Sequence, residues 1–260
     1  MKIFTYSTLL IFLVVAACQE PTEIQQTVAN TPAEGFNLQG SDTEAIAIAD
    51  SVMAAMGGRQ NWDNTRFIQW TFFGRRTLFW DKQTGNVMVE MPSDSLSIFL
   101  NVYDESKGVV EKNGVAFENK DSIQQYTDRG KSIWINDSYW LVMPFKLKDS
   151  GVTLKYVGEE VTDENTDADV LELTFEEVGK TPENKYWVYV DQSDHLVKQW
   201  DFFRNATDSI PGISTPWKDY KPYGNILLSG NRGRGQLTDI AVFDELPVVM
   251  QNMPLFNENS

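Results

Sequence analysis

Residues 66–91, RFIQWTFFGRRTLFWDKQTGNVMVEM, indicate the fold class of this chain, because apolar side chains recur in them at every second position. Side chains that alternate in this way share one face of a β-strand. The turn sequence Gln83-Thr84-Gly85-Asn86 separates two of the runs and is typical of a hairpin. The residues of the shared face are Ile68, Trp70, Phe72, Leu78, Trp80, Val87, Val89 and Met91. The stretch therefore predicts antiparallel strands, each with one apolar face.

The same alternation, interrupted by turn residues at short intervals, continues to residue 243. Further strands are predicted at 97–103, 109–110, 115–117, 152–157, 170–175, 186–190, 196–203, 226–229 and 237–243. A long antiparallel meander curls, because each strand is twisted relative to its neighbour. We therefore expect a mainly β fold of the α+β class, a curved antiparallel half-open β-barrel or meander.

Two segments depart from the period of two and are expected to cover this sheet. Ala45 to Met56 carries apolar residues at spacings of three and four, and Gly57-Gly58 ends the pattern, so it predicts an N-terminal helix. Asp121 to Phe145 predicts short helices or a long covering loop, which we interpret as a helical lid. A helix of about twelve residues is too short to cover so wide a sheet face alone.

The N-terminus is typical of an exported lipoprotein. An apolar run from Ile3 to Val14 leads to Val15-Ala16-Ala17-Cys18, an aliphatic residue and two small residues before the single cysteine. This lipobox predicts a signal peptide over 1–17, lipidation of Cys18 and a flexible tether over 18–40, followed by a single β-rich domain over 41–260. An ordinary signal peptide with an incidental cysteine is one alternative. A membrane-spanning anchor is another, although the apolar run is shorter than the roughly 20 residues that a span requires.

The charge balance limits the partners of the chain. With 37 acidic and 22 basic residues the formal net charge is −15, so nucleic acid and anionic lipid head groups would be repelled. Attachment to a membrane is then expected through the N-terminal lipid alone. We expect the cell envelope, with the lipid in the outer membrane, while the leaflet and the oligomeric state stay open.

Few residues in the chain suit catalysis or cofactor binding. The single cysteine is the lipidation candidate and His195, the single histidine, falls in a hairpin turn, so a disulfide, a metal cluster or a Ser-His-Asp triad is not expected. The loop Asn231-Arg232-Gly233-Arg234-Gly235 lacks the ending of a phosphate-binding loop and is interpreted as a β-turn. We therefore predict no catalytic residue, no metal and no cofactor.

Aromatic residues are numerous, with 8 Trp, 9 Tyr and 15 Phe, and they suggest where a ligand would bind. If the apolar strand faces were concave beneath the lid, they would line a cavity suited to acyl chains. The candidate lining residues are Ile68, Trp70, Phe72, Leu78, Trp80, Val89, Met91, Trp134 and Trp140. The alternative is that these side chains fill a solid core.

The lipobox, the tether, the helix ending at Met56-Gly57-Gly58 and the long meander together resemble the LolA/LolB class of lipoprotein-carrier folds over roughly Ser41 to Phe243. The stretches SYWLVMPFKL (138–147) and WKDYKPYG (217–224) are also similar to segments of uncharacterised lipoproteins of the Bacteroidota. The carrier resemblance implies a curved half-barrel with a helical lid. It also implies an arginine on an early strand that matters for function, and Arg66, Arg75 and Arg76 are its three alternative counterparts.

Three classes of function follow from these observations. The first is a membrane-anchored envelope lipoprotein that binds a lipid or another apolar ligand, in the trafficking of lipids or lipoproteins. The second is a non-enzymatic interaction module of an envelope complex. An envelope hydrolase comes last, because no pairing of nucleophile and base is visible in the sequence.

Overall fold

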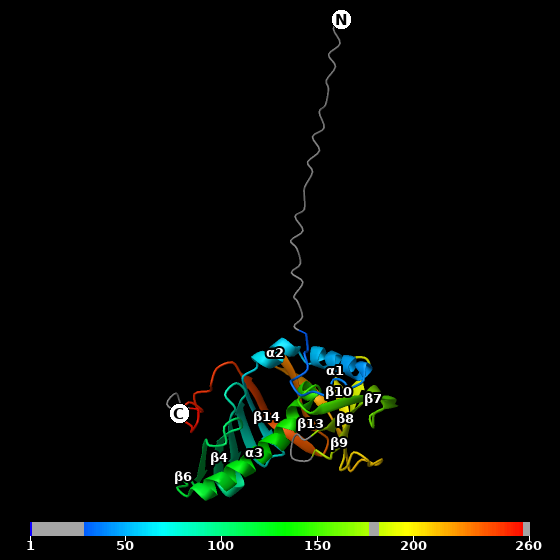
Figure 1. The fold of residues 1–260 in the computed structure, drawn as a ribbon. Helices are drawn as coiled ribbons and strands as arrows, with labels where there is room; N and C mark the ends of the chain where they lie inside the picture. The colour runs from blue at the N-terminus through cyan, green and yellow to red at the C-terminus, as the bar shows by residue number, and fades with distance from the viewer. Residues whose placement is uncertain (2–28, 177–181, 257–260) are drawn as a thin grey trace.

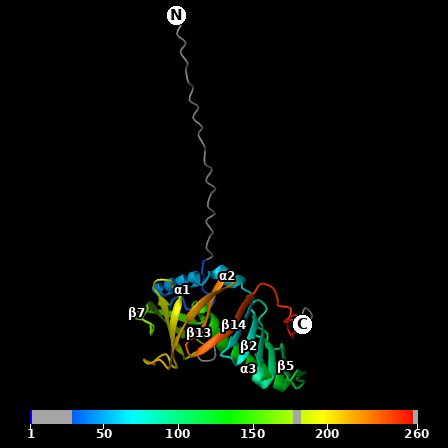
Figure 2. The ribbon, with the colours of Figure 1, turned by 180° about the vertical axis from the view of Figure 1, so that it is seen from behind.

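The computed structural model describes Met1, residues 29–176 and residues 182–256, and its strands form two antiparallel sheets. The larger sheet has nine strands in the order β12-β13-β14-β1-β2-β3-β4-β5-β6, and the smaller has five in the order β11-β10-β9-β8-β7. Figures 1 and 2 show the two sheets at opposite sides of the molecule, with α3 running obliquely between them and α1 and α2 along one end.

The larger sheet contains the strands that the period of two predicts. Its strands are β1 (Phe67–Phe72), β2 (Arg76–Asp81), β3 (Asn86–Met91), β4 (Leu96–Asn101), β5 (Gly108–Lys112), β6 (Val115–Ala116), β12 (Lys218–Tyr223), β13 (Ile226–Arg232) and β14 (Gly235–Phe243). The smaller sheet consists of β7 (Val152–Val161), β8 (Asp167–Phe175), β9 (Lys185–Asp191), β10 (Val197–Phe203) and β11 (Ile213–Pro216). The sequence did not predict β11 and β12.

The register of the first strands brings the alternating residues onto one face. Trp80 lies opposite Ile68 on β1 and opposite Val87 on β3, and Leu78 lies opposite Trp70 and Val89 in the same way. All six side chains belong to the main hydrophobic core. The predicted antiparallel pairing of this region, with the alternating residues on one shared face, is therefore confirmed.

The larger sheet is curved but does not close into a barrel. β14, the last strand in sequence, pairs with β1, the first, while β12 and β6 stand at the two ends of the sheet. The mainly β, half-open fold with covering helices is confirmed.

The helices and helical turns are α1 (Thr43–Ala55), α2 (Arg59–Asn64), α3 (Lys120–Val142), η1 (Pro92–Asp94) and η2 (Met143–Lys146). α1 is the predicted N-terminal helix and buries Ala45, Ala49, Val52 and Met53. Asp42 precedes it, but its carboxylate accepts hydrogen bonds from Lys155 Nζ and the Tyr156 amide instead of capping the helix. None of the helices in the described residues is long and apolar enough to cross a membrane.

The segment predicted as short helices or a loop is one continuous helix of 23 residues, α3. Asn119 caps its start by accepting a hydrogen bond from the Ser122 amide. Gly130 lets the helix lie close to β4, since a Cβ there would stand 3.0 Å from Ile98 Cγ2. The buried positions include Thr127, Gly130, Asp137 and Ser138, so the helix lacks the continuous apolar stripe from which a helix is predicted.

A second, smaller core covers the other face of β1 to β4. Phe67, Phe79, Met88 and Phe99 point to this face and pack against the C-terminal segment 244–256. Phe79 and Phe256 make an edge-to-face contact with ring centroids 5.4 Å apart. These strands are consequently buried on both faces, which the sequence did not predict.

The chain is attached to the domain well before residue 41. The amide of Ala33 donates to the Lys148 carbonyl, the amide of Asn37 donates to the Val152 carbonyl, and Phe36 is 9% exposed within the main core. Residues 33–40 therefore run along the domain, whereas the tether was expected to extend as far as Gly40. The predicted signal peptide and the lipidation candidate Cys18 lie outside the described residues.

Candidate functional site

A cavity of about 870 Å³ lies along one flank of α3, where the helix bridges the two sheets. Its walls come from β2, α3, η2, β7, β8 and β9, together with residues of the connecting segments. The aromatic lining residues are Trp80, Tyr103, Trp134, Tyr139, Trp140, Phe175 and Tyr186. Concave sites of roughly 300–1,000 Å³ with mainly apolar walls are typical of small-molecule pockets.

The aromatic rings of the wall are held by contacts with one another. Trp134 of α3 stands edge-on to Trp80 of β2, with ring centroids 5.3 Å apart. At the smaller sheet, Tyr139 of α3 lies 5.7 Å from Tyr186 of β9 and 6.4 Å from Phe175 of β8. Each ring is therefore positioned by a neighbour from another element, which gives the pocket a preformed shape.

Three lining residues carry buried polar atoms with no hydrogen-bond partner among the described residues: Trp80 Nε1, Trp134 Nε1 and Tyr139 Oη. Burial raises the pKa of the Tyr139 phenol well above 10, so this side chain is neutral at physiological pH. An unsatisfied donor costs about 1–3 kcal/mol. Three of the buried polar atoms that lack a partner among the described residues therefore belong to the pocket wall.

Lys82, which follows β2, is the most perturbed cation of the pocket wall. Its Nζ donates to the Trp62 carbonyl and lies 3.4 Å from the centroid of the Trp62 ring. Burial lowers the Lys82 pKa to about 7, an effect that Asp63 opposes and that Arg59 and Lys146 add to. Lys82 is thus close to the point where it gains or loses its charge at neutral pH.

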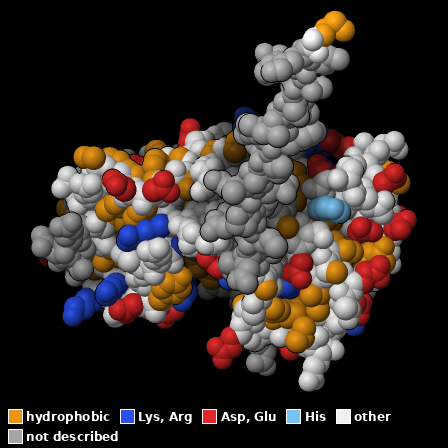
Figure 3. Space-filling model, turned by 90° about the horizontal axis from the view of Figure 1, so that it is seen from above, with side chains coloured by type: hydrophobic (Ala, Val, Ile, Leu, Met, Phe, Trp, Pro, Cys, Tyr) orange, Lys and Arg blue, Asp and Glu red, His pale blue; other side chains and the backbone are white. Residues whose placement is uncertain are grey.

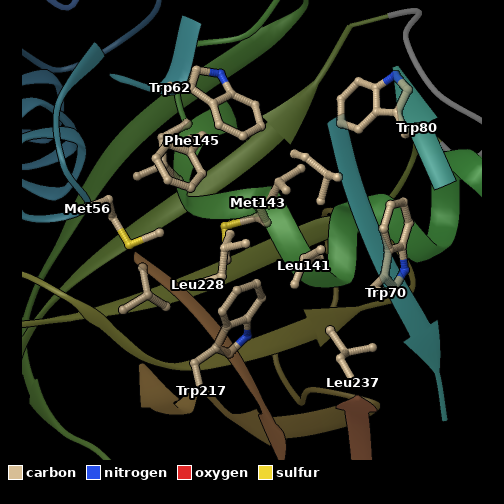
Figure 4. Close-up of a cluster of buried hydrophobic side chains, with 14 of the residues drawn as sticks. Met56, Trp62, Trp70, Trp80, Leu141, Met143, Phe145, Trp217, Leu228 and Leu237 are labelled. Atoms are coloured by element: carbon tan, nitrogen blue, oxygen red, sulfur yellow. The ribbon is translucent and has the colours of Figure 1, made fainter. Parts of the chain in front are cut away.

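Trp62, on the short helix α2, provides the ring over which Lys82 Nζ lies. Its ring is stacked on Phe145 of η2, with centroids 4.3 Å apart and planes inclined by 9°. Figure 4 shows this stack beside Met56 and Met143 in the main core. Lys82 therefore rests on the Trp62 ring, which Phe145 in turn holds against the core.

Two arginines attach α3 to the larger sheet. Arg76 of β2 forms an ion pair with Asp137 of α3, and Arg232 of β13 donates through Nη2 to the Trp140 carbonyl at 2.7 Å. Arg232 also lies over the Trp217 ring at 3.5 Å, and burial lowers its pKa to about 9. Of the three arginines considered from the sequence, Arg66 pairs with Asp81 of β2, whereas Arg76 reaches α3. Arg75 lies in the turn before β2.

The structure divides the nine predicted lining residues into two groups. Trp80, Trp134 and Trp140 line the pocket. The other six do not line it and are buried in the main core: Ile68, Trp70, Phe72, Leu78, Val89 and Met91. The structure does not bring these six to the pocket, because α3 and the neighbouring strands pack directly on their face of the sheet, as Trp70 in Figure 4 illustrates.

Sequence reasoning missed Lys82, Tyr139 and Tyr186 as pocket residues. Phe175 ends a predicted strand, 170–175, but the sequence does not assign it to a site. The sequence contains one signal for Lys82. This lysine directly follows an apolar alternating strand and precedes a hairpin turn, so it is expected at the end of the sheet. Tyr139 and Tyr186 carried none, because their meeting depends on the path of α3 across both sheets.

The other candidate sites of the chain do not line the pocket. His195 is exposed in the turn between β9 and β10. Residues 231–235 form the tight turn from β13 to β14, in agreement with the interpretation of this loop as a β-turn. Within the described ranges, no group of three or more His, Cys, Asp and Glu side chains could hold a metal ion.

No protein-family model matches the chain, and no curated protein sequence matches it. Among solved structures it is similar to a DUF1329 family protein from Desulfovibrio piger, with 12% identity, 83% of this chain and 98% of that chain covered, and a TM-score of 0.44. It is also similar to a candidate outer membrane lipoprotein-sorting protein domain from Vibrio parahaemolyticus, with 10% identity and a TM-score of 0.42. The likeness covers 80% of this chain and 96% of that chain. A LolA superfamily protein from Nitrosomonas europaea has 12% identity, coverages of 76% and 94%, and a TM-score of 0.38. At these values the likeness assigns no ligand and no activity to this chain.

Proposed function

We propose that this chain is a lipid-anchored cell-envelope protein that binds a lipid or another apolar ligand in the pocket beside α3. The observation that carries this proposal is the pocket itself, about 870 Å³ in volume and lined by seven aromatic side chains. A solid core would leave no such space between the helix and the sheets.

The chemistry of the wall suits a flexible hydrocarbon chain. Aromatic faces and the side chains of Val142 and Val152 offer wide apolar contact, and they demand no particular hydrogen-bonding pattern. Each methylene that leaves water contributes about 0.8 kcal/mol, so ten of them contribute roughly 8 kcal/mol before the cost of ordering the chain. About 8 kcal/mol corresponds to micromolar binding only before that cost is subtracted, so further buried methylenes have to offset the ordering of the chain.

The lipobox at Val15-Ala16-Ala17-Cys18 supports the location in this proposal. A lipid at Cys18 would hold the domain near a membrane surface, and we place its role in the handling of lipids or lipoproteins there. The outer membrane is the proposed site of attachment.

The proposed role is binding, not catalysis. Of the three serines of the pocket wall, Ser132 and Ser138 donate to backbone carbonyls of their own helix at 2.8 and 3.4 Å, and Ser150 is hydrogen-bonded to no base among the described residues. His195 lies in an exposed turn and does not line the pocket. A hydrolase would need a nucleophile within hydrogen-bond reach of a base. The described part of the pocket offers no such pair.

The test is native mass spectrometry of the chain from Gln19 onward, followed by extraction of bound material and titration with a fluorescent fatty acid. We expect a co-purified lipid-sized mass or saturable binding near one ligand per chain. A protein that emerges empty and shows no saturable binding would overturn the proposal. The interaction module would then be favoured, with the exposed pair Val248 and Val249, 77% and 66% accessible, as its apolar surface.

A further inference from the structure

The charge of the pocket wall is opposite in sign to that of the whole molecule. The chain carries a formal net charge of −15, and Figure 3 shows Asp and Glu side chains spread across the face that it presents. The charged residues that line the pocket are Lys82, Lys146 and Asp149, which sum to a positive charge. A purely apolar ligand does not account for this difference in charge between the pocket wall and the rest of the chain.

Lys82 is the source of the excess positive charge. Lys146 is neutralised by Asp149 through an ion pair three residues along the chain. Near Lys82, Arg59 and Asp63 neutralise each other, with Arg59 Nε 2.9 Å from Asp63 Oδ2. Among the carboxylates that the structure describes, none forms an ion pair with Lys82, whose Nζ contacts the Trp62 carbonyl and ring.

A half-buried ammonium group without a carboxylate is costly unless something compensates its charge. The Trp62 carbonyl and ring compensate in part, and the ammonium retains further donors for a third partner. Because Lys82 belongs to the lining of the pocket, that partner can be a bound ligand. Burial lowers the pKa of Lys82, and an anion placed beside the ammonium group would counteract this effect by stabilising the charged form.

We propose that the ligand is an amphiphile with an anionic head group, a carboxylate or a phosphate, which Lys82 neutralises while the hydrocarbon part lies among Trp134, Tyr139, Phe175 and Tyr186. This inference rests on the proposed function, since it names the class of ligand that the same pocket takes. The head group lies at the end of the pocket formed by β2 and η2. The hydrocarbon extends along α3 toward the smaller sheet.

The experiment compares ligands that share one chain and differ in the head group. Oleate, 1-oleoyl lysophosphatidic acid and oleyl alcohol displace a fluorescent fatty acid from the chain that begins at Gln19, at pH 6.5 and below their aggregation concentrations. We expect at least one anionic ligand to bind about tenfold or more tightly than oleyl alcohol, as a charge-assisted hydrogen bond provides. The stronger of the two anionic ligands identifies the head-group chemistry.

Variants of Lys82 locate the effect. Lys82→Gln should remove the preference for the anion and leave the affinity for oleyl alcohol within about twofold, whereas Lys82→Arg should retain the preference. Lys155→Gln is the matched control, because Lys155 is an exposed lysine that pairs with Asp42 outside the pocket. Circular dichroism checks that each variant is folded.

The outcomes separate this inference from the proposed function. Equal affinities of the wild-type chain for oleate, the lysophosphatidic acid and oleyl alcohol would overturn the anionic head group and leave the apolar pocket intact, whatever the variants do. A preference for the anion that survives Lys82→Gln would also overturn the role of Lys82. Failure of all three ligands to displace the probe, or of the probe to bind, would overturn the proposed function itself.

Discussion

Arg76 of β2 and Asp137 of α3 are joined by two hydrogen bonds, with Arg76 Nε 2.5 Å from Asp137 Oδ2 and Arg76 Nη2 2.7 Å from Asp137 Oδ1. Asp137 is 0% exposed, and Asn136 donates a further hydrogen bond to its Oδ1 at 2.9 Å. The arginine also lies over the Phe72 ring at 4.9 Å. This pair fixes the C-terminal half of α3 against the larger sheet, less than one helical turn from each of the lining residues Trp134 and Trp140.

We expect Arg76→Ala to lower the free energy of unfolding by about 3–5 kcal/mol, because it leaves the Asp137 carboxylate buried without a counter-ion. Urea denaturation followed by tryptophan fluorescence measures the loss. Arg75→Ala, at the neighbouring turn position, is the control and should change stability by less than about 0.5 kcal/mol. A loss of similar size in both variants would mean that the pair does not hold α3 in place.

Arg232 provides a second test of how α3 is attached. Its guanidinium donates to the Trp140 and Ser229 carbonyls and to Ser229 Oγ, at 2.7 to 2.9 Å. Lysine has no planar fork with which to reach these acceptors together. We expect Arg232→Lys to cost about 1–3 kcal/mol of stability by thermal or urea denaturation. Arg234→Lys, two residues further along the same turn, should be neutral; an equally neutral Arg232→Lys would assign Arg232 no structural role.

The strands could be predicted from the sequence because a strand with one buried face shows its period directly. Ile68, Trp70 and Phe72 face the main core as the alternation requires. The prediction stopped where both faces are buried, since nothing local indicated that Phe79 would be covered by Phe256, 177 positions later in the chain. The extent of a strand is a local property of the sequence, whereas the segment that covers the strand is not.

The pocket could be predicted only in part, for the same reason. Trp134 and Trp140 lie on α3, whose buried side chains include small and polar ones such as Gly130 and Asp137, so its course was not visible as a helical period. The smaller sheet then brings Phe175 and Tyr186 to Tyr139. Phe175 and Tyr186 lie 36 and 47 positions after Tyr139, and sequence spacing carries no information on such a meeting.

The titration of Lys82 predicts a dependence of stability on pH. Its pKa is lowered from the ordinary value of 10.5 to about 7 in the folded chain, so the unfolded chain binds this proton more tightly. Stability from this group is therefore lost as the pH falls from 10.5 to about 7 and is constant below that. Arg59, Asp63 and Lys146 act on it from the neighbouring elements.

We expect the free energy of unfolding to rise between pH 7 and pH 9 more steeply in the wild-type chain than in Lys82→Met. The window ends at pH 9 so that the tyrosines, whose ordinary pKa is 10.0, contribute little. Urea denaturation at half-unit intervals measures both slopes. Parallel curves for the two proteins would mean that Lys82 keeps an ordinary pKa in the folded state.

The lipidation site gives a prediction that is independent of the pocket. Cys18→Ala should prevent lipid attachment, because the thiol is the group that receives the lipid, and it should leave an uncleaved precursor or a soluble product. Membrane fractionation and intact mass spectrometry distinguish these forms. A variant that had lost its signal peptide and still sedimented with membranes like the wild type would refute the assignment of Cys18.

The strongest test of the pocket compares two tryptophans at different positions, one in the pocket wall and one in the main core. Trp134 lines the cavity and stands edge-on to Trp80, while Trp70 is 0% exposed within the main core and does not line it. Trp70→Ala should cost about 3–5 kcal/mol of stability, because it opens a cavity in a close-packed region. Its affinity for a fluorescent fatty acid, corrected for the folded fraction, should stay within about twofold of wild type.

Trp134→Ala should behave in the opposite way. Removal of the ring enlarges a space that already exists, so the loss of stability should be smaller than for Trp70→Ala, whereas the contact area with a bound chain shrinks. We expect the affinity to fall about fivefold or more, since an aromatic contact of this kind contributes on the order of 1 kcal/mol or more. Titration at a temperature where both variants are folded measures this directly. If Trp70→Ala weakened binding as much as Trp134→Ala, the ligand would lie in the main core and not beside α3.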